Sequence, residues 1–242
     1  MEVQNCFQRY ELKYIITPEK QMNLISALGD TIKHDKFYKS TVMNIYYDTE
    51  NYRLIRESLE HPLYKEKLRL RSYLVPKDES SPVFVELKKK YDSVVYKRRE
   101  IMKYSEATDF INNGYRTPLI RKSQIKDEIK YFIDFYNNMR PSVYLSYSRK
   151  AYVDANNPNL RITFDSDIVW RDFDINLDSG PYGHPLLDRD LILMEIKVAD
   201  AMPLYLSRIL DKEKIYKTSF SKYGRAYEEM ISKHKKGNIV YA

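Results

Sequence analysis

The stretch YKEKLRLRSY, residues 64–73, decides the fold, because basic residues alternate in it with leucines. One leucine stands between Lys67 and Arg69, and another stands between Arg69 and Arg71. Successive side chains of a β-strand point to opposite faces, so this pattern predicts a strand with one basic face and one apolar face. The function then depends on whether the basic face meets bulk water or a shared interior.

Ionic residues with the same spacing recur along the chain. Glu and Lys lie two residues apart at Glu11/Lys13, Glu86/Lys88 and Glu195/Lys197, and the pattern extends to Arg9, Lys97, Arg99, Arg161 and Asp165. Taken singly, each such strand is typical of an antiparallel sheet with one wet face. Their recurrence, with basic groups in excess, favours several charged faces that line one interior and bind a polyanion there.

The composition is that of an ordinary globular domain with a positive charge. The chain has 242 residues, of which 31% are charged and 43% hydrophobic, and its formal net charge is +7. The charge favours an anionic partner, whether nucleic acid, a phosphorylated metabolite or an acidic membrane surface. Neither glycine-rich phosphate-binding motif occurs, so side chains would bind any phosphate.

The sequence also indicates the cellular compartment. A single cysteine, Cys6, excludes an internal disulfide. No stretch of about 18 apolar residues and no leader pattern occurs. We therefore expect a cytoplasmic protein, associated with a membrane only through a partner.

Hydrophobic periodicity and turn signals predict an α+β chain with about eight antiparallel strands. The expected strands are residues 9–16, 41–48, 64–75, 83–90, 94–103, 142–153, 159–165 and 191–198. The expected helices are residues 18–28, 105–113, 122–139, 203–212 and 220–234, with a short polar helix or turn over 49–58. Such a sheet either stays open or closes into a barrel.

Nine motifs follow one another along the chain. They are RYELKY (9–14), IYYDT (45–49), YKEKLRLRSY (64–73), VFVELKKK (83–90), YKRRE (96–100), YLSYSRKAY (144–152), LRITFD (160–165), LMEIKV (193–198) and FSKYGRAY (220–227). In this order they resemble the vacuolar transporter chaperone (VTC) domain of the triphosphate tunnel metalloenzymes, also called the CYTH superfamily. The resemblance implies a single domain over 1–242, with a core at 7–230 and a basic end at 231–242. The implied fold is an eight-stranded antiparallel β-barrel with helices packed outside.

The resemblance implies a metal-dependent phosphotransferase that moves the γ-phosphate of ATP onto a growing polyphosphate chain. The catalytic residues it implies are Lys13, Arg69, Arg71, Lys88, Arg149, Arg161 and Lys197. It implies phosphate binding by Lys67, Lys97, Arg99, Ser221 and Lys222, and binding of Mn²⁺ or Mg²⁺ by Glu195 and Glu11. Phosphoryl transfer needs mainly alignment and charge neutralisation, which arginine forks and lysine ammonium groups supply.

Three alternatives stay open. Tunnel hydrolases usually begin with Glu-x-Glu-x-Lys, and Arg9 stands at the first glutamate position here, which favours a polymerase over a triphosphatase. A non-catalytic polyphosphate-binding accessory of a membrane-protein partner is the second alternative, and single-strand nucleic-acid binding on an open face is the third. We interpret Glu86 as an internal salt-bridge partner, and Glu11 as either a structural partner of Lys13 or a metal ligand.

Overall fold

The computed structural model describes residues 10–92, 94–113 and 123–239. Its strands are β1 (Tyr10–Ile16), β2 (Ile32–Asp48), β3 (Tyr64–Ser72), β4 (Pro82–Tyr91), β5 (Val94–Lys103), β6 (Arg140–Asp154), β7 (Arg161–Arg171), β8 (His184–Pro185) and β9 (Ile192–Val198). Its helices are α1 (Pro18–Leu28), α2 (Arg53–Leu59), α3 (Tyr104–Asn113), α4 (Gln124–Tyr136), α5 (Leu204–Lys212) and α6 (Lys222–Ile239), with a 3-10 turn at Gly29–Thr31. The expected α+β class is confirmed.

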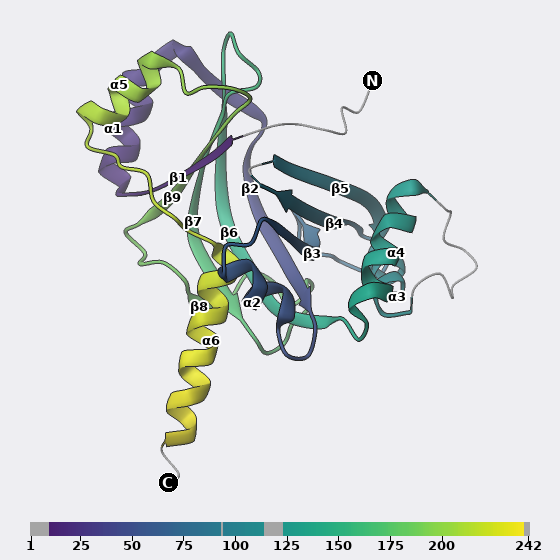
Figure 1. Cartoon of the computed structure of the whole chain (residues 1–242). Helices are drawn as coiled ribbons and strands as arrows, with labels where there is room; N and C mark the ends of the chain where they lie inside the picture. The colour runs from purple at the N-terminus through teal and green to yellow at the C-terminus, as the bar shows by residue number, and fades with distance from the viewer. Residues whose placement is uncertain (1–9, 93, 114–122, 240–242) are drawn as a thin grey trace.

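The strands form one antiparallel sheet that curls on itself. Their order is β1-β9-β7-β6-β2-β3-β4-β5, with the short β8 beside β7. The sheet bends so that β1 comes round toward β4 and β5 (Figure 1), and Lys88 on β4 lies 3.7 Å from Glu11 on β1. Since β1 and β5 are the two ends of the hydrogen-bonded order, the expected barrel is curled rather than closed by backbone hydrogen bonds.

The convex face of the sheet is apolar, and helices cover it in two places. Helices α1 and α5 pack on β1, β9 and β7, where Ile162 and Ile196 are fully buried. Helices α3 and α4 pack on β3, β4 and β5, where Leu68, Leu70 and Leu87 are fully buried. Each such side chain contributes about 1.5–3 kcal/mol through burial. Because strand side chains alternate, covering this face turns the charged residues to the concave side.

A third apolar cluster fills one end of the concave side and receives helix α6. It includes Val42, Leu145, Trp170, Phe220 and Met230. The helix begins there and projects outward from the body (Figure 1). The Ser221 hydroxyl caps it by accepting a hydrogen bond of 3.1 Å from the N–H of Gly224. The amino end of α6, which favours anions, therefore lies among the charged strands.

Two strands are longer than the sequence indicated. Strand β2 begins at Ile32 rather than at residue 41, and its first half pairs with β6 across a register shift between His34 and Lys39. Strand β7 continues past Asp165 to Arg171. Helix α6 continues past residue 230 to Ile239, so the described part of the basic end is helical. No helix in the described part of the chain is long and apolar enough to cross a membrane.

Candidate active site

Cross-strand register aligns the charged residues in rows across the concave face. One row holds Glu11 on β1, Lys197 on β9 and Arg161 on β7. In the next row, Lys13 on β1 stands opposite Glu195 on β9. Residues directly opposite each other in an antiparallel pair share a face, so these side chains all point to the same side.

The buried carboxylate of Glu86 on β4 is the centre of the first charge cluster. Its oxygens lie 2.7 Å from Arg69, 2.7 Å from Lys97 and 2.5 Å from Arg99, and Arg71 approaches to 3.8 Å. Burial alone would raise the pKa of Glu86, but these four cations outweigh burial and hold the pKa well below its usual range. Burial lowers the pKa of Lys97 to about 6, although Glu86 opposes that change. Near neutral pH the three arginines alone outnumber the one carboxylate, so the cluster has a net positive charge.

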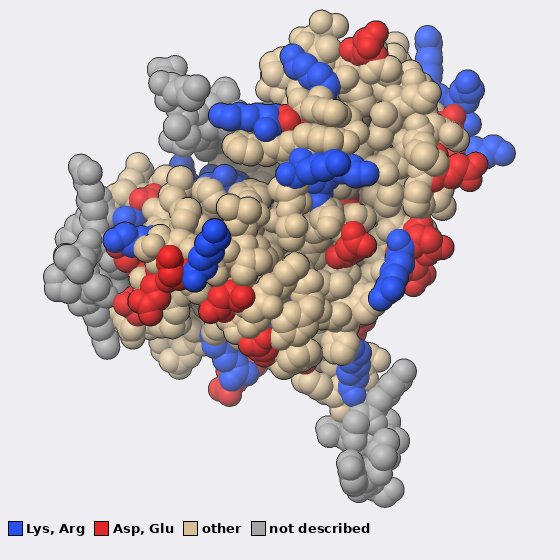
Figure 2. Space-filling view, turned by 180° about the vertical axis from the view of Figure 1, so that it is seen from behind, with Lys and Arg blue, Asp and Glu red and all other residues tan. Residues whose placement is uncertain are grey.

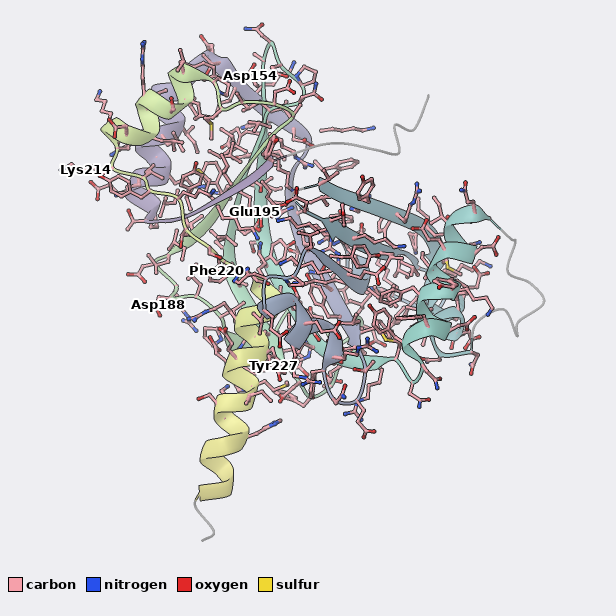
Figure 3. All side chains as sticks on the ribbon, viewed as in Figure 1. Asp154, Asp188, Glu195, Lys214, Phe220 and Tyr227 are labelled. Carbon is pink, nitrogen blue, oxygen red and sulfur yellow. The ribbon has the colours of Figure 1, made fainter. Side chains whose placement is uncertain are left out.

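The second cluster joins β6, β7, β9 and the start of α6. The ammonium group of Lys222 lies 2.6 Å from Asp165 and 2.8 Å from Glu195. Arg149 lies 2.6 Å from Asp165 and 3.4 Å from Glu195. Burial would lower the pKa of Lys222, but the two carboxylates raise it above its usual value. Figure 3 shows Glu195 close to the segment that carries Phe220 into α6. Two cations and two carboxylates balance in these contacts, and Lys197 also approaches Glu195 to 3.8 Å.

The third cluster bridges the opening between β1 and β4. Glu11 lies 3.2 Å from Lys13, 3.7 Å from Lys88 and 4.0 Å from Lys197. Burial would raise the pKa of Glu11, but Lys88, Lys197 and Lys13 together lower it to about 2. Burial lowers the pKa of Lys197 to about 8, although Glu195 and Glu11 oppose that change. The ionic contacts thus complete a ring that the backbone leaves open.

The chain leading into α6 draws two lysines toward the helix. The Lys13 ammonium group donates to the Phe220 carbonyl at 2.7 Å, and Lys67 donates to the Ser221 hydroxyl at 3.4 Å. Among the described residues, no ion pair joins Lys67 to a carboxylate. Burial, reinforced by Lys88 and Lys13, lowers the pKa of Lys67 to about 7. Lys67 is therefore only about half protonated near pH 7 in the empty protein, and an incoming anion would favour its charged form.

The structure brings the expected site residues together on the concave face. Arg161 lies at its outer rim, where it is 38% exposed and lies 3.2 Å from Asp35. Glu86 pairs with cations, as we interpreted it from the sequence. Arg9, which distinguishes the polymerase pattern from the hydrolase pattern, lies outside the described residues. The catalytic and binding roles of all these residues stay predictions.

Two site residues were given no role from the sequence. Asp165 is, with Glu195, one of the two carboxylates of the second cluster. The Tyr147 hydroxyl accepts a hydrogen bond of 3.4 Å from Arg71. The Arg149 guanidinium also lies 5.1 Å from the Tyr147 ring centre, which is a cation–π contact. Tyr147 stands two residues before Arg149, so the period-two rule could have found it.

The expected metal ligands are already paired with cations. In the chain segments that the structure describes, no group of three or more His, Cys, Asp or Glu residues is arranged to hold a metal ion. Asp165 and Glu195 converge on the ammonium group of Lys222, so they offer a pair of carboxylates rather than a complete cage. Mg²⁺ commonly binds through one or two carboxylates plus substrate phosphates. The donor set therefore fits a metal ion held largely by phosphate oxygens.

Part of the basic charge also reaches the outer surface. On the face seen in Figure 2, acidic and basic side chains are intermixed, and several Lys and Arg side chains flank a hollow across the middle.

Comparisons with known proteins identify a family and a similar fold. The family model described as "VTC domain" matches residues 8–231. A putative adenylate cyclase from Bacillus halodurans is 14% identical, with a TM-score of 0.54, over 90% of this chain and 96% of that chain. A protein from Pyrococcus horikoshii is 13% identical, with a TM-score of 0.44, over 93% of this chain and 99% of that one. The Mimivirus capping enzyme triphosphatase is 12% identical, with a TM-score of 0.36, over 87% of this chain and 89% of that chain.

No curated protein matches the chain significantly. At these identities the likeness to the cyclase supports the fold alone.

Proposed function

The chain belongs to the VTC-domain family, and we propose that it is a metal-dependent polyphosphate polymerase. It would transfer the γ-phosphate of ATP to the end of a polyphosphate chain held on the concave face of the sheet. The observation that carries the proposal is the unbalanced positive charge there: three arginines and one lysine share the Glu86 carboxylate, and Lys67 has no described carboxylate partner. A polyanion would supply the missing negative charge, whereas a surplus of positive charge that is enclosed without a ligand is costly.

The residues divide the work by chemistry. Arginine forks at Arg69, Arg71 and Arg149 suit bidentate contacts with phosphoryl oxygens, and the lysines act as movable point charges. Ser221 and Lys222 at the amino end of α6 would hold the distal end of the chain, because a helix amino end favours anions. Mn²⁺ or Mg²⁺, bound through Glu195, would neutralise charge between adjacent phosphates.

The reaction needs no strong general base. A bond forms between a terminal phosphate oxygen of the acceptor and the γ-phosphorus, while the bond from that phosphorus to the β–γ bridging oxygen breaks and ADP leaves. The attacking oxygen is already an anion. The cations around Glu11 and Glu86 hold the pKa of each carboxyl below its usual range, so both are poor bases for activating water. This favours transfer to phosphate over hydrolysis.

Incubation of the purified protein with ATP and Mn²⁺ or Mg²⁺ tests the proposal. We expect ADP release together with an acid-labile polymer. Arg69→Ala should abolish turnover and leave the fold intact, because Glu86 keeps Lys97 and Arg99 as partners. Arg98→Ala is the matched control, since Arg98 lies on the convex side of β5 and pairs with Glu128. Absence of polymer across nucleotides, primers and metals would reject the polymerase.

Two other outcomes would point elsewhere in the same family. Release of inorganic phosphate without polymer would identify a triphosphatase. Tight polyphosphate binding without ATP turnover would identify a binding accessory, and only then would a search for a membrane-protein partner be warranted.

A further inference from the structure

Strand β2 departs from regular pairing at the rim of the concave face. His34 stands opposite Tyr152 and Lys39 opposite Lys150, so residues 35–38 of β2 face a single residue of β6. Bulges re-aim side chains and are common beside functional sites. Here the bulge turns Asp35 toward β7, where its Oδ2 lies 3.2 Å from Nε of Arg161.

The contact between Asp35 and Arg161 differs from the other ion pairs of the site. Glu86 and Asp165 are 0% exposed and hold arginines at 2.7 and 2.6 Å, whereas Asp35 is 16% exposed and its distance is longer. The Nε of Arg161 is buried without a hydrogen-bond partner among the described residues. Asp35 is meanwhile fixed from the other side, because its Oδ1 accepts a hydrogen bond of 3.0 Å from the N–H of Phe37. A loosely held carboxylate therefore occupies an anion position at Arg161.

A lysine that the sequence analysis did not single out lies in the same row. Lys33 on β2 stands opposite Val153, Val153 opposite Arg161, and Arg161 opposite Lys197. These residues share a face, and neighbouring strands are about 4.8 Å apart, so Lys33 and Arg161 are separated by roughly 10 Å at the backbone. Lys33 is exposed and, within the described residues, is joined to no carboxylate by an ion pair. The rim thus offers two cations on either side of a path onto the concave face.

We propose that Lys33 and Arg161 form an outer subsite for a phosphoanhydride chain, and that Asp35 is the internal anion that competes for it. The inference rests on the proposed function, because it needs a phosphate chain on the concave face. An arriving phosphoryl group takes the place of the Asp35 carboxylate at Arg161 and gains Lys33 as a second partner. Asp35 thereby weakens binding of the outer part of the chain and lets the chain slide or leave.

The test measures equilibrium binding of tripolyphosphate, ATP and long-chain polyphosphate to the full chain and its variants. Asp35→Asn should tighten binding of long-chain polyphosphate by about twofold to fivefold, the size expected when one partly exposed ion pair is removed. Lys33→Ala should weaken it by a similar factor. Both variants should leave tripolyphosphate unchanged, because the deep clusters suffice for a short chain. Lys150→Ala, an exposed lysine on the opposite face of β6, is the control and should change nothing.

The outcomes separate this inference from the proposed function. If the wild-type protein binds no polyanion, the proposed function fails and the subsite fails with it. If it binds them all and neither variant alters long-chain binding, only the subsite is wrong. Equal effects on tripolyphosphate and long-chain polyphosphate would also overturn it, because the two residues would then belong to the deep site. An effect on ATP as large as the effect on long-chain polyphosphate would overturn it too, because ATP carries no more phosphoryl groups than tripolyphosphate.

Discussion

Neutralising Glu86 removes the carboxylate that holds four cations of the site together. Glu86→Gln should destabilise the empty protein by about 3 kcal/mol, the lower end of the loss seen when one partner of a buried ion pair is removed. The lower end applies because Lys97 and Arg99 are 38% and 35% exposed and recover part of their hydration. Urea unfolding of wild type and variant measures the difference.

A polyanion should partly replace the lost carboxylate. At a tripolyphosphate concentration of about 100 times its Kd, wild type gains about 2.7 kcal/mol. If the uncompensated cations of the variant bind tripolyphosphate about tenfold more tightly, the variant gains about 1.4 kcal/mol more at the same concentration. The stability difference should therefore shrink by about half when the ligand is present.

Glu128→Gln is the matched control for this experiment. Glu128 on α4 also pairs with two cations of β4 and β5, Lys89 at 2.9 Å and Arg98 at 2.8 Å, but on the convex side. It is partly exposed, so its loss should cost no more than about 1 kcal/mol, with or without ligand. A loss below about 1 kcal/mol for Glu86→Gln, unchanged by tripolyphosphate, would refute the view that Glu86 holds an unsatisfied cation array.

Three further predictions follow from single residues. Lys67 has a pKa of about 7 in the folded protein against about 10.4 when unfolded, so the empty protein should gain stability as pH rises from about 7 to 10. Lys67→Met should make that rise smaller in unfolding experiments, while the lowered pKa of Lys197 keeps part of it. An unchanged profile would contradict this prediction. The fully buried Arg171 donates to the carbonyls of four loop residues. Arg171→Met should therefore lower stability by about 3 kcal/mol or more in thermal unfolding. A loss below about 1 kcal/mol would argue against Arg171 holding this loop. Tyr223→Phe removes the hydroxyl that donates to buried Asp48 at 2.8 Å but keeps the ring, so it should lower the free energy of unfolding by about 1–2 kcal/mol. It should also weaken tripolyphosphate binding at the neighbouring start of α6. Unaltered binding in calorimetry would disprove this second effect.

Much of the strand pattern could be predicted because it is local. Lys67, Arg69 and Arg71 alternate with leucines, and the structure has a strand there whose leucines are buried. The first half of β2 was missed because residues 32–40, IKHDKFYKS, are polar and do not alternate. Its strand conformation comes from pairing with β6, which is more than a hundred residues away in sequence. Asp35 and Lys33 were missed for the same reason.

The sequence by itself determined which residues share a face and that the shared faces carry more cations than carboxylates, because both follow from side-chain alternation and from counting. Only the tertiary structure decided how far the sheet curls and which carboxylate neutralises which cation. Lys88 meets Glu11, and Lys222 meets Asp165, across long separations in the chain. Such pairings depend on strand order and register, which are set by the burial of the convex face and the docking of α6, and not by any local pattern.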